Sequence, residues 1–121
     1  MAHLVIEYTH NIKAEADIPG LLKNANKLLA SASQDVPPSG IRSRALELQN
    51  YDIADGQGDY AFVHATLRMD ASIPEAVKRA TSDELFKLIK QHFAALYEKR
   101  YLALSMELVD VNTVEMPCHT S

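Results

Sequence analysis

The stretch "ADGQGDYAFVHATLRM", residues 54–69, divides the chain into two similar halves. Its first six residues are rich in glycine and aspartate, which is typical of a turn. The apolar and β-branched residues that follow indicate a strand. A strand, a helix and a second strand are predicted before the turn, and a helix and a last strand after residue 69. The predicted order is therefore β-α-β-β-α-β, with one β-α-β unit in each half.

Residue spacing gives the approximate bounds of the elements. Alternation of side chains predicts strands over His3–Tyr8 and over 101–111, and a long, irregular strand is predicted from Ile41 to about Ile53. A stripe of apolar residues at helical spacing runs from Leu21 to about Ala32.

Local signals mark where the two helices begin. Asp17 is a suitable N-cap for the first helix, with Pro19 in its first turn. Ser72 and Glu75 have the spacing of a capping box for the second helix, which is expected to continue to about Arg100.

Right-handed crossovers place both helices on one face of a single sheet. The predicted fold class is an α+β two-layer sandwich. It forms one domain over 1–121, with halves at about 2–56 and 57–112 and a tail at 113–121. The other sheet face has no helix to cover it. Apolar residues on both faces, such as Val5 and Ile6, predict that self-association covers an apolar surface there. A monomeric ferredoxin-like domain has the same element order and fits equally well at this point.

Composition narrows the classes of partner. The 121 residues carry a net charge of −4 and no long basic run, which argues against nucleic acid as the main partner. No apolar run approaches the roughly 18 residues of a membrane span. Charged residues interrupt the first twenty positions, so no signal peptide is expected. The single cysteine, Cys118, fits a reducing compartment. The sequence predicts a cytoplasmic protein without a membrane or nucleic-acid partner.

Motifs for cofactors and metals are not evident. The chain has no P-loop, GxSxG or GxGxxG pattern. Its five histidines lack ligand spacing, and His64 and His92 lie among apolar residues, where packing is the more common role. Cys118 could act as a nucleophile only if the tail folded over a site. No metal and no cofactor are therefore expected.

Two features point to chemistry. In "GIRSR", residues 40–44, Arg42 and Arg44 are two positions apart and share one face of an extended chain. Paired guanidiniums suit carboxylates, although a solvated strand face that pairs with Glu47 is an alternative. The second feature is the chain start, beside Ala2. An α-amino group has a pKa of about 8. Burial or nearby cations lower this pKa toward neutrality, where the amine can act as a general base.

The sequence resembles the 5-carboxymethyl-2-hydroxymuconate Δ-isomerase family of the tautomerase superfamily. The resemblance rests on the stretches "EADIPGLL", "GIRSR", "ADGQGDYAFVHATL", "LFKLIKQHFAAL" and "LALSMEL", residues 15–108. It implies a homotrimer whose sheets face inward. It also implies ketonisation of an anionic 2-hydroxymuconate-type dienol in homoprotocatechuate catabolism, without metal or organic cofactor. In that family an N-terminal proline amine moves the proton, and arginines hold the carboxylates of the substrate. Arg42 matches the family arginine of "GIRSR".

The chain departs from the family pattern at two places. Ala2 stands where the family has its proline, so removal of Met1 would expose a primary amine. The family also has an arginine between the third strand and the second helix, whereas "MDASIP", residues 69–74, has none. Arg68 lies just upstream and is a candidate substitute. Two alternatives remain open: a non-catalytic trimer that binds an anionic small molecule, and a tautomerase that acts on a smaller dienol.

Overall fold

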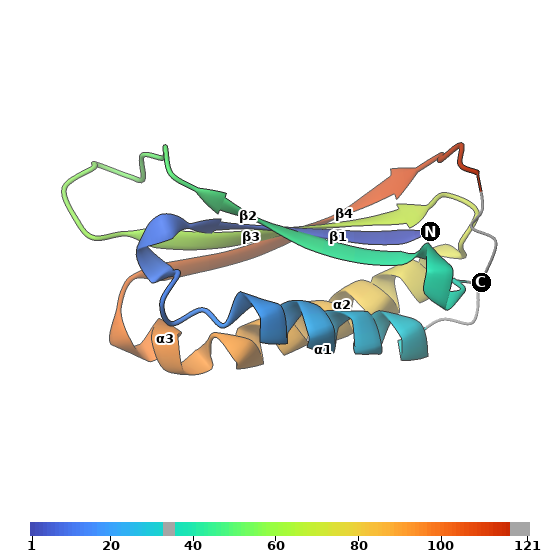
Figure 1. Cartoon of the computed structure of the whole chain (residues 1–121), viewed down its shortest axis with the longest axis horizontal. Helices are drawn as coiled ribbons and strands as arrows, with labels where there is room; N and C mark the ends of the chain where they lie inside the picture. The colour runs from blue at the N-terminus through green and yellow to red at the C-terminus, as the bar shows by residue number, and fades with distance from the viewer. Residues whose placement is uncertain (33–35, 117–121) are drawn as a thin grey trace.

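The computed structural model describes residues 1–32 and 36–116 and has the predicted order of elements (Figure 1). The elements are β1 (Ala2–Thr9), the short 3-10 turn η1 (His10–Ile12), α1 (Ile18–Ala32), a second 3-10 turn η2 (Pro38–Gly40), β2 (Ile41–Leu48), β3 (Ala61–Asp70), α2 (Glu75–His92), α3 (Ala94–Lys99) and β4 (Leu102–Val111). None of the helices in these ranges is long and apolar enough to cross a membrane.

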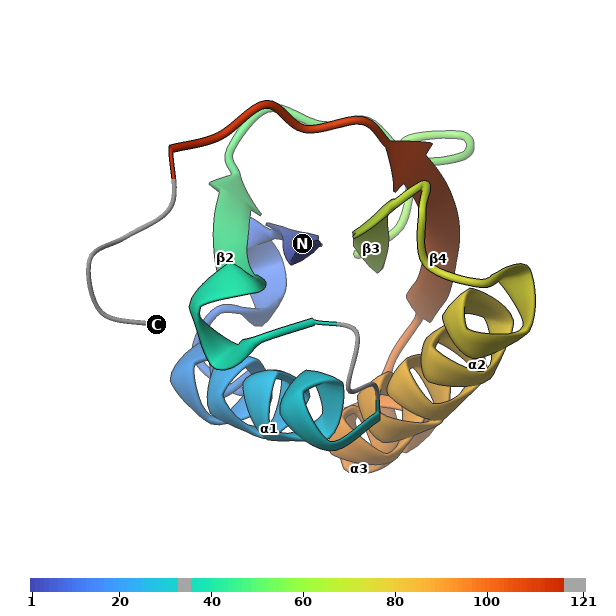
Figure 2. The ribbon, with the colours of Figure 1, turned by 90° about the vertical axis from the view of Figure 1, so that its right-hand side faces the viewer.

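The four strands form one mixed sheet in the order β2-β1-β3-β4. β1 and β2 are parallel, β3 and β4 are parallel, and the two pairs meet along the antiparallel β1 and β3. In a ferredoxin-like domain another strand separates the two strands of each β-α-β unit. Here they are direct neighbours, which confirms the tandem arrangement. Figure 2 shows the helices gathered below one face of the sheet.

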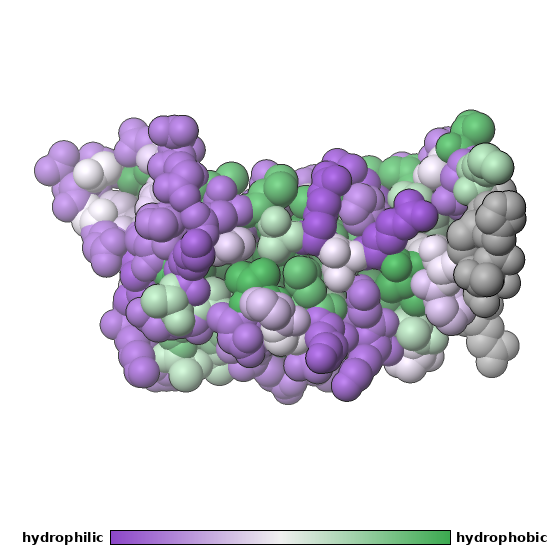
Figure 3. Space-filling model, viewed as in Figure 1, coloured by the Kyte–Doolittle hydropathy of each residue, from purple (hydrophilic) through white to green (hydrophobic). Residues whose placement is uncertain are grey.

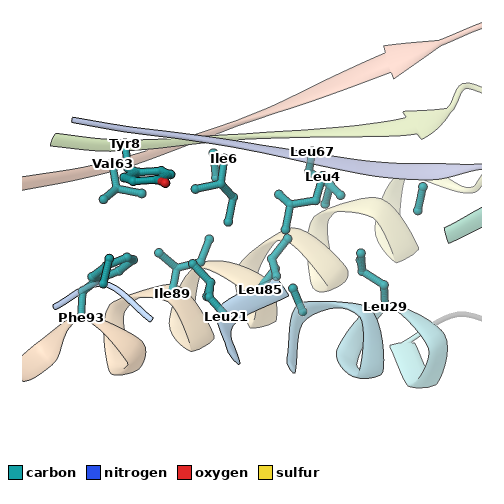
Figure 4. Packing of buried hydrophobic residues seen from close by; sticks show 14 of the residues in the cluster. Leu4, Ile6, Tyr8, Leu21, Leu29, Val63, Leu67, Leu85, Ile89 and Phe93 are labelled. Carbon is teal, nitrogen blue, oxygen red and sulfur yellow. The ribbon is translucent and has the colours of Figure 1, made fainter. Parts of the chain in front are cut away.

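The core fills the space between the sheet and the helices (Figure 4). Leu4 and Ile6 of β1 point toward the helices and are fully buried. Leu21 of α1 and Leu85 of α2 meet them from the other layer. Burial of each such side chain contributes about 1.5–3 kcal/mol, so this interface holds the two layers together.

The predicted start of α1 is confirmed. The Asp17 carboxylate accepts a hydrogen bond from the backbone N–H of Gly20 at 3.3 Å, and Asp17 has a positive φ of 43°. A side chain at Gly20 would collide with the same carboxylate, so any other residue there would force the Asp17 side chain to move.

The predicted capping box of α2 is wrong. Ser72 donates its hydroxyl hydrogen bond to Asp70 at 2.9 Å instead, and α2 begins at Glu75 without a side-chain cap. Ser72 therefore stabilises the turn between β3 and α2 by binding Asp70 at the end of the strand, and it does not cap the helix.

Two predicted bounds are also wrong. The helix does not run unbroken to Arg100: it is interrupted at Phe93, whose backbone leaves helical geometry and whose side chain is buried in the core. β2 ends at Leu48 and not near Ile53. Thr9 pairs with Leu48 as the last residue of β1, so β2 has no partner beyond it.

The sheet face away from the helices, here called the open face, is only partly the apolar surface that was predicted. Its apolar residues are Val5, Leu46, Leu48, Phe62, Ala103, Val109 and Val111, and strand alternation also places many polar side chains on it. The polar residues are His3, Glu7, Thr9, Arg42, Arg44, His64, Thr66, Arg68, Asp70, Ser105 and Glu107. Figure 3 shows hydrophilic and hydrophobic side chains together along the upper edge of the molecule, and a hydrophobic band lower down, toward the helices. A partner that binds the open face must therefore pair with or hydrogen-bond to its charged side chains.

Candidate active site

The start of β1 is held between two other strands. Ala2 pairs with Ile41 of β2 and with Met69 of β3, and only 1% of Ala2 is exposed. The carbonyl of Met1 accepts a hydrogen bond from the backbone N–H of Asp70 at 3.1 Å. The beginning of the chain therefore has a fixed position at one end of the sheet.

Asp70 is a charged neighbour of this position that the sequence did not single out. The backbone N–H of Ser72 donates to its carboxylate at 3.0 Å. This hydrogen bond, followed by that from the Ser72 hydroxyl, holds the pKa of Asp70 below its usual value. The carboxylate thus stays charged and keeps the turn beside the chain start closed.

Three arginines surround the next residue of β1. His3 pairs with Arg42 on one side and with Arg68 on the other, and Arg44 lies two positions further along β2. All three arginines are exposed on the open face. The predicted shared face of Arg42 and Arg44 is therefore present, and the fold adds Arg68 from a strand that is distant in sequence. The roles of Ala2, Arg42 and Arg44 in the reaction stay predictions.

These arginines have no acidic partner within the described residues, where no ion pair involves them. Glu47, the partner considered for Arg42 and Arg44, instead contacts His10 at 3.0 Å and Lys13 at 3.2 Å. The arginines are thus available to an anionic ligand.

His3 was not identified as a functional residue from the sequence. Burial lowers its pKa below 6.5, and the positive charges of Arg44, Arg68 and Arg42 lower it further, in that order. At neutral pH the ring is therefore uncharged. Its position directly after Ala2 was visible in the sequence, but the arginine on β3 became its neighbour only through the fold.

The lowered pKa of His3 predicts a pH effect on stability. The unfolded chain binds a proton near the ordinary pKa of about 6.5, whereas the folded chain binds it only at lower pH. Stability is therefore expected to fall as the solution is acidified between these two values. The urea midpoint should fall less steeply for His3→Gln than for the wild type. Equal slopes would show that His3 is not perturbed.

The remaining candidate residues lie elsewhere. His64 contacts Ser105 at 2.7 Å and Glu107 at 3.0 Å on the open face, while His92 contacts the backbone oxygen of Ala16 at 2.7 Å. No cluster of three or more potential metal ligands occurs in the described parts of the chain. Cys118 lies outside the described residues.

Comparison with known proteins decides the family. The sequence model of the 5-carboxymethyl-2-hydroxymuconate isomerase family matches residues 2–119. The chain belongs to this family. A 5-carboxymethyl-2-hydroxymuconate Delta-isomerase of Escherichia coli is 45% identical over 112 residues, which are 93% of this chain and 88% of the relative.

Solved structures agree with membership of the isomerase family. A 5-carboxymethyl-2-hydroxymuconate isomerase from Deinococcus radiodurans R1 has a TM-score of 0.91 and 38% identity, over 97% of this chain and 90% of that one. A structure described as a "Q0 fused 4-OT wild type symmetric trimer" has a TM-score of 0.68 and 16% identity, over 98% of this chain and 92% of that one. The second likeness supports the predicted tautomerase fold alone.

Proposed function

We propose that this protein is a Δ-isomerase that converts 5-carboxymethyl-2-hydroxymuconate, a dienol, into its oxo isomer during aromatic catabolism. The observation that carries the proposal is the match to isomerases of this name along nearly the whole chain. The cluster of arginines without acidic partners beside the chain start fits a substrate with three carboxylates.

The reaction moves one proton and needs a base and a cationic environment. Removal of Met1 would leave the amine of Ala2 at the start of β1. In its neutral form this amine takes the proton of the substrate's 2-hydroxyl group. The resulting ammonium then returns a proton to a carbon atom of the substrate. Electrons shift through the conjugated system between these steps, so the atoms balance. Arg42 and Arg44 hold carboxylates and stabilise the negative charge of the intermediate dienolate.

The amine must be neutral to act as a base. An α-amino group with a pKa of about 8 is mostly protonated at neutral pH. Only the neutral fraction of the amine can take the proton of the dienol.

We also propose that the protein works as a homotrimer with the open faces turned inward. Each chain leaves one side of β2 and one side of β4 without a strand neighbour. The structural neighbour described as a symmetric trimer has the same fold. Contact between copies would cover Leu46, which is 42% exposed on the open face.

The proposal is tested by mixing the purified protein with 5-carboxymethyl-2-hydroxymuconate and following loss of the dienol absorbance. We expect ketonisation at a rate proportional to enzyme concentration, and a mass of three chains by light scattering. Binding of the dienol without turnover would instead identify a non-catalytic anion-binding trimer. Turnover only of dienols with fewer carboxylates would identify a different substrate.

A further inference from the structure

We propose that Arg68 and Arg42 form a two-armed clamp across β1 that grips two separate carboxylates of one ligand, with His3 between them. The clamp gives the protein a preference for dicarboxylates over monocarboxylates. It deepens the proposed function, because it assigns a specificity-determining role to Arg68 at the same site.

The register of the sheet builds the clamp. Arg42 on β2 and Arg68 on β3 both lie opposite His3, one from each neighbouring strand. Neighbouring strands are about 4.8 Å apart, so the two arginine Cα atoms are separated by roughly 10 Å across β1. Both side chains project from the open face, since all three residues share it. The ends of one extended ligand can therefore meet a guanidinium each, while its middle lies over His3.

Charge around the clamp favours an anion. Two acidic groups near Arg68 already have other partners: Glu107 of β4 accepts hydrogen bonds from His64 and Thr66, and Asp70 of β3 accepts two from Ser72. Glu7 of β1 also lies on the open face, four positions from His3. Within the described residues neither carboxylate forms an ion pair with Arg68. The charge of Arg68 nevertheless adds to the hydrogen bond from His64 in lowering the pKa of Glu107, so it is partly offset by this carboxylate. In the proposed trimer the open faces would also approach one another, so the same guanidiniums of other copies would add positive charge. Bound carboxylates would offset this repulsion.

His3 suits the middle of the clamp because it adds no further charge. Its pKa is lowered by burial and by the surrounding arginines, so the ring is neutral at about pH 7. A neutral ring can lie under the conjugated carbon chain of a ligand and offers one N–H donor. The clamp lies directly beside Ala2, which places a gripped ligand next to the proposed base.

The test measures binding of unreactive probes by calorimetry. Adipate carries a carboxylate at each end, and hexanoate has the same carbon chain with one carboxylate. The wild type should bind adipate more tightly than hexanoate. Arg68→Gln should weaken adipate binding by about ten- to a hundredfold, the usual range for loss of one charge-assisted contact. Its effect on hexanoate should be several times smaller, because Arg42 can still hold the single carboxylate.

Two further variants make the test specific. Arg79→Gln removes a guanidinium from α2, where it pairs with Glu75 at 3.0 Å, and should leave adipate binding unchanged. Arg68→Lys keeps the charge and the long side chain, so its affinity should lie between those of the wild type and Arg68→Gln. Circular dichroism and light scattering check that the variants fold and assemble.

The clamp is contradicted if Arg68→Gln binds adipate like the wild type, if Arg79→Gln loses as much affinity, or if the wild type does not prefer adipate. Because binding is measured without turnover, the result is independent of the proposed reaction. A protein that prefers adipate through Arg68 but does not ketonise the dienol would retain the clamp and disprove the isomerase function.

Discussion

Arg42→Ala is expected to lower kcat/KM for ketonisation by about 10²- to 10³-fold, the usual effect of removing one group that stabilises negative charge in a transition state. Arg42 is exposed on the open face, lies opposite His3, and has no acidic partner in the described part of the chain. Its guanidinium is therefore free to contact a carboxylate and the developing dienolate. Steady-state kinetics with the dienol substrate measures the effect.

Two variants separate this effect from a general loss of charge. Arg42→Lys keeps a positive charge but cannot form the planar two-point contact, so its activity should lie between those of the wild type and Arg42→Ala. Arg79→Ala removes an exposed guanidinium on α2, on the opposite side of the molecule, and should leave kcat/KM unchanged. Near-normal activity of a folded Arg42→Ala protein would show that Arg42 is not part of the active site.

The order of elements was predictable because each element carries its own periodic signal. Leu4 and Ile6 alternate toward the core, and Asp17 caps α1 through a hydrogen bond to Gly20 that lies close in sequence. The face of Arg42 and Arg44 follows from the same rule of alternation. Such features depend on neighbours within a few residues, and these are visible in one sequence.

Features that depend on distant neighbours were not predictable in this way. The end of β2 at Leu48 depends on where β1 ends, and the break at Phe93 depends on a core formed by both halves. The environment of His3 is the clearest case. Arg68 is remote in sequence, and only the antiparallel pairing of β1 with β3 places it beside His3. The polar character of the open face likewise followed from the full register of four strands.

The second large effect concerns the amine at the chain start. Ala2 lies between Ile41 and Met69, and its neighbour His3 lies between Arg42 and Arg68. Retention of Met1 would move the free amine by one residue, about 3.3 Å along an extended strand. Proton transfer requires contact at about 3 Å, so retention is expected to reduce activity by about 10²- to 10⁴-fold, the usual contribution of a general base.

The most direct test compares two samples of the wild-type protein, one with Met1 removed and one with Met1 retained, as verified by intact mass. Ketonisation of 5-carboxymethyl-2-hydroxymuconate is measured for both under the same conditions. The sample without Met1 should convert the dienol at least a hundredfold faster, within the range of about 10²- to 10⁴-fold for a general base. Equal rates for the two samples would show that the amine of Ala2 is not the base.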